Sequence, residues 1–313
     1  VLNQVITNGV EHRKLIIVDG STAFFGGSCI ADKYFGNKAF WGAYEKASKS
    51  LGEEAVKEAI FNPESTRDSK GILHPPFEVH PNMALPKNHD SAIRFRGDSV
   101  HQLQTGFLQT WLYQGRELDP ASSDREIRSR YFPKMERISA GQETTSLKIT
   151  HGIPWGSSEM RQNLLALVNS ASKSLDIEIA YVMAPEFVDA LHSAAKRGVK
   201  IRLITNSEQS TDTQIAWASF RNSYDTLLQT GNVEIFETKT YSHVKQFIAD
   251  KRIVFTSTGN PEYNSWERGY DELVLIDNPK LANQIIKDVI VRDSQPDRST
   301  QVTLEGLKQT SFW

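Results

Sequence analysis

The distribution of apolar and polar residues predicts an α/β chain. In its second part, short apolar runs typical of buried strands occur at 147–150, 175–182, 199–205, 233–236, 243–248, 253–256 and 273–276. Helical periodicity between them predicts helices at 157–171, 185–198, 212–231 and 279–289. Pro185 and Gly198 bracket one of these helices, as expected for a helix start and a helix end. Strands that alternate with helices of this length predict an α/β sandwich with a mixed sheet.

The first part of the chain has fewer such segments. Strands are predicted at 14–18, 22–25 and 92–95, and a helix at 100–112. Residues 37–88 form an insertion, with a predicted surface helix at 44–61 and a proline-rich loop at 62–87. This loop is either a decoration without catalytic role or a lid over a site. Residues 114–143 are polar and read as an irregular linker, which predicts two domains, 1–143 and 144–313.

Composition excludes some classes of protein. The net charge of −2 argues against a non-specific nucleic-acid binder, which would carry a basic excess, but it does not exclude a local basic groove. Cys29 is the single cysteine, so no internal disulfide can form. No apolar run reaches the length of a membrane span. The chain begins with Val1, only eleven residues before His12, and we interpret this start as processed or truncated.

The pattern H-x-K-x-x-x-x-D occurs twice, each time opening an apolar strand. Its members are His12, Lys14 and Asp19 in the first copy, and His243, Lys245 and Asp250 in the second. Histidine and lysine two residues apart share one face of a strand, whereas the aspartates lie on the other face. An imidazole can attack phosphorus or carry a proton, and the adjacent ammonium can hold phosphate oxygens. For the two aspartates we therefore expect a structural role, ion pairing or capping at the interface between the two halves.

Small residues follow each copy in matching register, seven to nine places after the aspartate, at 26–28 and 257–259. With the motifs, these segments resemble the phospholipase D superfamily and, within it, the bacterial cardiolipin synthase-like branch. The run 26–36 resembles the first-motif tail of that branch, and 189–205 and 227–234 resemble its second lobe. Cys29 departs from the asparagine that family members usually have, whereas Asn260 retains it in the second half.

The resemblance implies a phospholipase D-like bilobal α-β-α sandwich with mixed sheets and pseudo-twofold symmetry. Lobe 1 would be 1–143 and lobe 2 would be 144–313. Roughly a hundred residues lie between the first strand of lobe 2 and His243, but only eleven precede His12. We therefore expect lobe 1 to lack its N-terminal part, which an N-terminal fragment or another segment would complete.

The resemblance also implies the mechanism. His12 and His243 would flank one phosphate, with one imidazole forming a phosphohistidine and the other protonating the leaving alkoxide. The family favours His12 as the nucleophile. Glu272 and Asp90 would orient the imidazoles, the acidic residue of each half serving the histidine of the other.

Charge on the phosphate oxygens would be stabilised by Lys14 and Lys245, with Ser28, Thr258 and Asn260 as further phosphate-binding residues. We expect no metal and no cofactor, because the lysines supply the positive charge. The six other histidines show no metal-ligand spacing with one another, so we expect them to be solvated or hydrogen-bonded: His74, His80, His89, His101, His151 and His192.

These features predict a phospholipid substrate, with phospholipase D-type hydrolysis or transfer of a phosphatidyl group to an alcohol. They also predict a bacterial protein that is secreted or meets a membrane surface peripherally. A nuclease of the same superfamily is the alternative, although nucleic acid is the less expected partner. A non-catalytic scaffold is a third reading, against which both intact His/Lys/Asp sets argue.

Overall fold

The computed structural model describes residues 10–27, 49, 89–113, 123–135, 145–152 and 159–309. The chain divides into one unit of Val1–Ser28 with His89–Trp313 and a second unit of Cys29–Asn88. Apart from residue 49, all described residues belong to the first unit. The insertion at 37–88, including its predicted helix and its lid or decoration, lies outside the described residues except at that one position.

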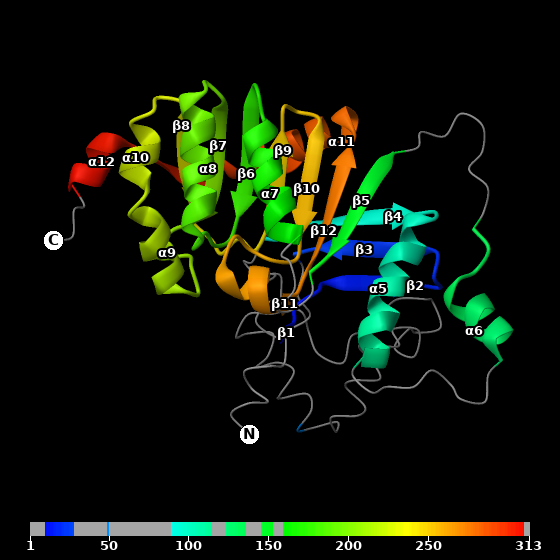
Figure 1. The fold of residues 1–313 in the computed structure, drawn as a ribbon. Coiled ribbons are helices and arrows are strands. Elements are labelled where there is room, and N and C mark those ends of the chain that lie inside the picture. Colours follow the sequence, from blue (N-terminus) through cyan, green and yellow to red (C-terminus); the bar gives the residue numbers. More distant parts are fainter. Residues whose placement is uncertain are drawn as a thin grey trace, which may run out of the picture. The chain divides into compact units, whose positions relative to one another are not determined.

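An eight-stranded mixed sheet forms the centre of the second half (Figure 1). Its spatial order is β13-β8-β7-β6-β9-β10-β12-β5. The strands are β5 (Ser146–His151), β6 (Ser174–Ile179), β7 (Lys200–Asn206), β8 (Val233–Thr238), β9 (Lys245–Ala249), β10 (Ile253–Ser257), β12 (Glu272–Asp277) and β13 (Ser299–Val302). Pairs β6–β7 and β7–β8 are parallel, and all other pairs are antiparallel. The predicted strands are therefore confirmed, and only β13 was missed.

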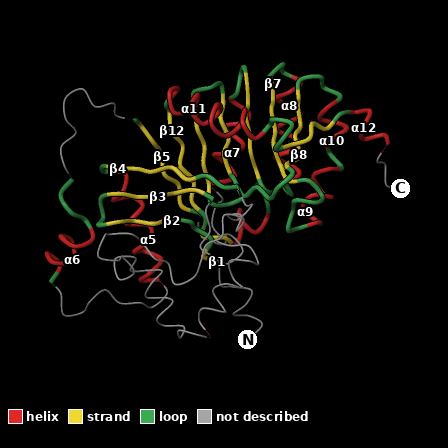
Figure 2. The backbone as a smooth tube through the Cα atoms, turned by 180° about the vertical axis from the view of Figure 1, so that it is seen from behind, coloured by secondary structure: helices red, strands yellow, loops and turns green. Residues whose placement is uncertain are grey.

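Helices cover both faces of this sheet (Figures 1 and 2). One core layer contains side chains of α7 (Glu159–Ser170), α8 (Pro185–Lys196), α9 (Gln214–Arg221) and α10 (Tyr224–Leu228). The other layer contains side chains of α11 (Pro279–Ile285) and η3 (Ile286–Val291). Two separate helices, α9 and α10, replace the single helix predicted at 212–231. Strand β9 is buried along its whole length, because it lies in the middle of the sheet between the two layers.

The first half contributes a three-stranded sheet in the order β2-β3-β4. It consists of β2 (Leu15–Val18), β3 (Thr22–Gly26) and β4 (Ala92–Arg96), and α5 (Ser99–Tyr113) follows it. Its buried side chains share a core layer with the large sheet. By order and motif position, the three strands correspond to β9, β10 and β12. On the other face of this sheet, Ile16, Val18 and Phe24 are 40–49% exposed. A further segment that completes lobe 1 would cover such a face, and this completion stays a prediction.

The linker prediction for 114–143 is wrong at α6 (Asp124–Tyr131). Ser123 and Glu126 form a reciprocal capping box, which satisfies backbone donors at the start of this helix. A helix with no buried residue has no apolar stripe, so hydrophobic periodicity could not reveal it. Among the short elements, β1 (Val10–Glu11), β11 (Gly269–Tyr270), η2 (Asn264–Arg268) and α12 (Leu304–Gln309) were also not predicted.

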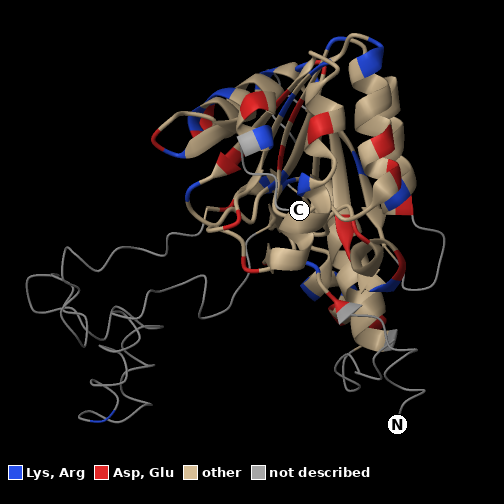
Figure 3. Ribbon diagram, turned by 90° about the vertical axis from the view of Figure 1, so that its left-hand side faces the viewer, with Lys and Arg blue, Asp and Glu red and all other residues tan. Residues whose placement is uncertain are grey.

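Surface charge is mixed over the described elements: Figure 3 shows acidic and basic residues interspersed. None of the described helices combines the length and the apolar character that crossing a bilayer requires.

Candidate active site

Strand β1 brings His12 beside the segment that precedes β12. Its partner β11 runs parallel to it, and the main-chain nitrogen of His12 donates to the Tyr270 oxygen at 3.2 Å. The Nδ1 atom of His12 lies 2.9 Å from Oδ1 of Asp271, a carboxylate with no exposed surface. Because a carboxylate oxygen only accepts, Nδ1 must carry the proton, and Nε2 is left as the reactive atom.

His243 has an equivalent setting built from the other half of the chain. Its main-chain nitrogen donates to the His89 oxygen at 2.8 Å. Its Nδ1 lies 2.9 Å from the carbonyl oxygen of Gly27 and 3.2 Å from Oδ2 of Asp90. The contact expected between Asp90 and His243 is therefore present. Each imidazole is held through Nδ1 by acceptors from the other half, which leaves Nε2 of both rings for chemistry.

Both lysines bind back to their own motif. Lys14 Nζ donates to the His12 oxygen at 2.7 Å, and Lys245 Nζ donates to the His243 oxygen at 2.8 Å. Lys245 is 1% exposed. The pKa of His243 is lowered, mainly by burial and further by the charges of Lys245 and Lys14, although Asp90 opposes the shift. Lys14 of the first motif is therefore near enough to His243 of the second for its charge to affect that imidazole.

Asp271 is the orienting carboxylate that the sequence did not reveal. Burial alone would raise its pKa, but the hydrogen bonds and charges of its neighbours outweigh burial and lower it. These neighbours are His12, the hydroxyl of Thr258 at 2.7 Å from Oδ1, and Lys14. Asp271 is consequently ionised at neutral pH and can stabilise positive charge on His12.

The prediction that Glu272 orients His12 is wrong. Oε1 of Glu272 instead lies 2.8 Å from Nδ1 of His151 and 3.4 Å from Nη1 of Arg13. Glu272 is the first residue of β12 and is paired with His151 in β5, whereas Asp271 precedes the strand. Consecutive residues at a strand start point in different directions, so only Asp271 faces His12.

Two glycines make room for the orienting carboxylates. A Cβ atom on Gly27 would lie 2.2 Å from Oδ1 of Asp90 and 2.5 Å from the His243 oxygen. A Cβ atom on Gly259 would lie 2.7 Å from Oδ2 of Asp271. The small residues after each motif are thus explained by the close approach of a carboxylate.

The predicted phosphate-binding residues have different outcomes. Ser28, like Cys29, lies outside the described residues. Thr258 donates its single hydroxyl proton to Asp271 and accepts from the Glu272 nitrogen at 2.9 Å, so we correct its role to positioning Asp271. Asn260 is 3% exposed and its Nδ2 donates to Glu262 at 3.2 Å. Its phosphate contact stays a prediction.

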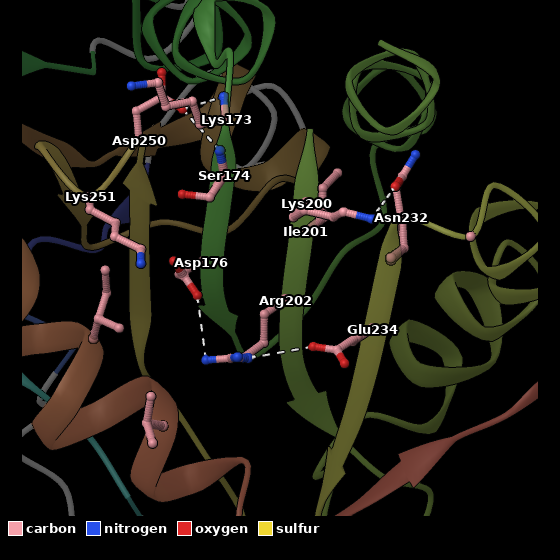
Figure 4. Close-up of a pocket in the computed structure, with 14 residues that line it drawn as sticks. Lys173, Ser174, Asp176, Lys200, Ile201, Arg202, Asn232, Glu234, Asp250 and Lys251 are labelled. Atoms are coloured by element: carbon pink, nitrogen blue, oxygen red, sulfur yellow. Dashed lines mark hydrogen bonds and ion pairs between the residues drawn. The ribbon is translucent and has the colours of Figure 1, made fainter. Parts of the chain in front are cut away.

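Asp250 acts as a cap, as expected, but it does not lie at the interface between the two halves. Its carboxylate accepts from the main-chain nitrogens of Ser172, Lys173 and Ser174 at 2.7–3.2 Å, within the second half. Figure 4 shows Asp250 beside Lys173 and Ser174. Burial would raise the pKa of Asp250, but these hydrogen bonds lower it. Asp250 lies at the far end of β9 from Lys245 and lines a pocket of about 890 Å³ there.

Asp19 occupies the corresponding turn after β2. It has a positive φ of 51°, as Asp250 has at 53°. Aspartate tolerates this left-handed conformation better than most residues, which explains its place in both motifs. Neither aspartate takes part in the contacts of the two imidazoles, which agrees with the structural role expected for both.

A pair of tyrosines adjoins His243. The rings of Tyr241 and His243 have centroids 5.9 Å apart, and the hydroxyls of Tyr241 and Tyr181 are 2.6 Å apart. Tyr181 also donates a hydrogen bond to Asp212. Tyr241 comes two residues before the motif histidine, which is the signal that could have drawn attention to it.

Comparisons with known proteins show which proteins the chain resembles. Residues 164–290 match the family described as cardiolipin synthase, PLD-like domain. The resemblance to the phospholipase D superfamily is confirmed. Cardiolipin synthase 1 of Bacillus cereus is 25% identical over 304 residues, which cover 96% of this chain and 50% of that protein. Cardiolipin synthase of Listeria monocytogenes is 23% identical over 309 residues, 97% of this chain and 51% of that protein. The chain thus spans about half the length of these relatives.

A solved structure shows the fold. Phosphatidylserine synthase of Haemophilus influenzae superposes with a TM-score of 0.57 at 13% identity, covering 93% of this chain and 63% of that one. The fold is the phospholipase D-like α-β-α sandwich with a mixed sheet.

Proposed function

We propose that this protein is a phospholipase D-type enzyme that transfers or hydrolyses the phosphatidyl group of phospholipids. One observation carries the proposal: each motif histidine is held through Nδ1 by a carboxylate of the other half, Asp271 for His12 and Asp90 for His243. A pair of imidazoles oriented in this reciprocal way, with a lysine beside each, suits double displacement at one phosphorus.

In the proposed reaction, Nε2 of one imidazole attacks phosphorus while the other imidazole donates a proton to the leaving alkoxide. The P–O bond to the leaving group breaks and a P–N bond forms, giving a phosphohistidine and a free alcohol. The second imidazole then removes a proton from the incoming alcohol or water, whose oxygen displaces the histidine. Lys14 and Lys245 stabilise the charge that develops on the phosphate oxygens.

The identity of the nucleophile can be tested directly. The resemblance favours His12, whereas the lowered pKa of His243 favours the neutral ring that attack requires. We keep His12 as the expected nucleophile. The intermediate is quenched in denaturant at mildly alkaline pH, because the P–N bond of a phosphohistidine is labile in acid. After digestion, mass spectrometry should find the phosphatidyl group on the peptide that contains His12. The phosphatidyl group on the His243 peptide would reverse the assignment.

A lipid substrate is favoured over a nucleic acid by the relatives, two of which are cardiolipin synthases and one a phosphatidylserine synthase. The net charge of −2 agrees with this choice. Contact with a membrane surface is part of the proposal, since the phosphodiester of a phospholipid lies at the surface of a bilayer. We also propose that an additional segment completes lobe 1 by covering the exposed face of the three-stranded sheet in the first half.

The test supplies phosphatidylglycerol vesicles with and without glycerol, and single-stranded DNA in a parallel reaction. We expect new phospholipid when an alcohol is present, phosphatidic acid when water is the acceptor, and no DNA cleavage. His243→Asn and His12→Asn should abolish turnover, while Asp19→Asn, outside the site, should not. Cleavage of DNA alone would replace the lipid proposal with the nuclease, and no turnover of either would favour the scaffold.

A further inference from the structure

Behind His243 lies a cluster of titratable side chains that the proposed reaction does not use. It consists of His89 in the segment before β4, Glu178 in β6, and Asp293 just after η3. One possible ligand atom of each residue lies within 4.8 Å of the others. Glu178 has no exposed surface, Asp293 is 3% exposed, and the His89 side chain is 22% exposed.

The cluster contains three buried atoms without hydrogen-bond partners, one from each residue: His89 Nε2, Glu178 Oε2 and Asp293 Oδ2. His89 Nε2 and Asp293 Oδ2 are only 2.6 Å apart, yet they lack the alignment of a hydrogen bond. A buried polar atom left without a partner costs about 1–3 kcal/mol. The ion pair between His89 and Asp293 offsets part of this cost for two of the atoms, whereas Glu178 Oε2 has no hydrogen bond. A common partner for all three atoms would remove the cost.

Neighbouring groups fix the carboxylates in this orientation. Ser242 donates to Oε1 of Glu178 at 2.6 Å, which leaves Oε2 for another ligand. Arg298 Nη1 lies 3.4 Å from Oδ1 of Asp293, which leaves Oδ2 facing His89. The site is therefore built from three separate segments and held by further contacts around it.

We propose that His89, Glu178 and Asp293 bind one divalent transition-metal ion, of the Zn²⁺ or Mn²⁺ class. Two carboxylates balance its charge, and an imidazole nitrogen favours such an ion over Ca²⁺ or Mg²⁺, which take oxygen ligands. Ligands at about 2.1 Å from a metal are about 3.0–3.4 Å from one another. His89 Nε2 lies 2.6 Å from Asp293 Oδ2 and 4.0 Å from Oε1 of the Glu178 carboxylate, so shifts below about 1 Å bring these groups to such spacings. Water would supply the remaining ligands.

The ion would act as a structural clamp, separate from the phosphate. His89 donates its main-chain nitrogen to the Tyr241 oxygen at 2.9 Å and accepts at its carbonyl from His243 at 2.8 Å. Asp90, which follows directly, contacts the His243 ring. Fixing His89 to β6 and to the end of η3 therefore holds the segment that positions Asp90. The proposal does not depend on the substrate assigned above.

The competing arrangement contains protons and no metal. Burial is the main cause that raises the pKa of Glu178 to about 8, so a proton can neutralise this carboxylate at neutral pH. Burial would lower the pKa of His89, but Asp293 and Glu178 raise it, and a charged His89 then forms a simple ion pair with Asp293. A metal-binding measurement distinguishes the two arrangements.

The experiment strips the full chain with a chelator, reloads it with Zn²⁺ or Mn²⁺, and measures metal after gel filtration by mass spectrometry. We expect about one ion per chain and a higher melting temperature, both lost in Glu178→Gln and in Asp293→Asn. The matched control is Asp176→Asn, because Asp176 is a buried carboxylate on the same strand that pairs with Arg202 at 3.7 Å, outside the cluster (Figure 4).

X-ray absorption of the reloaded wild-type protein gives a result that does not depend on the folding of any variant. We expect a shell of nitrogen and oxygen with imidazole scattering. Failure of the wild type to retain metal, a shell without imidazole, or equal retention by folded Glu178→Gln or Asp293→Asn would overturn the proposal. Loss of metal in Asp176→Asn would do so as well, because it would place the ion elsewhere. Circular dichroism shows whether each variant is folded. If Glu178→Gln or Asp293→Asn is unfolded, the test uses the other of these two variants.

Discussion

Replacement of Asp271 by Asn tests which carboxylate orients His12. The structure places Oδ1 of Asp271 at 2.9 Å from Nδ1 of His12 and gives Asp271 no exposed surface. Asn retains an acceptor but removes the charge, and its amide can also present a donor to the ring. We therefore expect a smaller kcat, with little change in KM, because the interaction matters most when His12 becomes positively charged.

The magnitude follows from the type of contact. A hydrogen bond to a charged group contributes about 1.5–3 kcal/mol, which corresponds to a decrease in kcat of about 10- to 150-fold. The decrease should be the same throughout the neutral range. Because the pKa of Asp271 is lowered in the folded protein, its contribution is present above the usual aspartate pKa and is lost only as pH falls through the lowered value.

Glu272→Gln is the matched control, because Glu272 is as buried as Asp271 and this substitution also replaces a carboxylate by an amide. It should weaken the contacts with His151 and Arg13 and lower thermal stability, but leave kcat of the folded enzyme within about twofold. The assay is release of glycerol from phosphatidylglycerol vesicles, well below the melting temperature of both variants. If Glu272→Gln loses as much kcat as Asp271→Asn, or if Asp271→Asn is fully active, the assignment of Asp271 is refuted.

Three further predictions use other parts of the molecule. Gly27→Ala should abolish turnover, because its Cβ would lie 2.2 Å from Oδ1 of Asp90. The control Gly97→Ala, where nothing lies within 4 Å and φ is +95°, should lower the melting temperature but keep activity. Equal activities of the two variants would contradict this prediction. Asp250→Ala should lower unfolding free energy by about 1–2 kcal/mol in urea titrations without affecting kcat, as loss of a cap does. That difference should shrink as pH falls through the lowered pKa of Asp250, and a pH-independent difference would refute the capping explanation. Lys245→Met should reduce kcat about 100- to 1000-fold by removing charge stabilisation, and a decrease confined to KM would show that this lysine only binds substrate.

Much of the fold was readable from local pattern. Apolar runs and their spacing predicted nearly every strand of the large sheet, because a buried strand needs consecutive apolar side chains whatever surrounds it. The two-residue spacing of His12 and Lys14 placed both on one face of one segment, and the structure adds that the ammonium bonds to the histidine's own carbonyl. Helix α6 escaped this reasoning because its start depends on a capping box and its surface is polar.

Tertiary structure alone decided the residues that surround the imidazoles. Asp271 and Glu272 are adjacent acids, and only the pairing of β12 with β5 determines which one turns toward His12. The cluster of His89, Glu178 and Asp293 joins residues far apart in the sequence, so no motif spacing could reveal it. Sequence determines which chemical groups are available and on which face of a strand they lie. Which of them meet depends on long-range packing, because contacts between distant segments arise only when sheets and helices bury their apolar faces together.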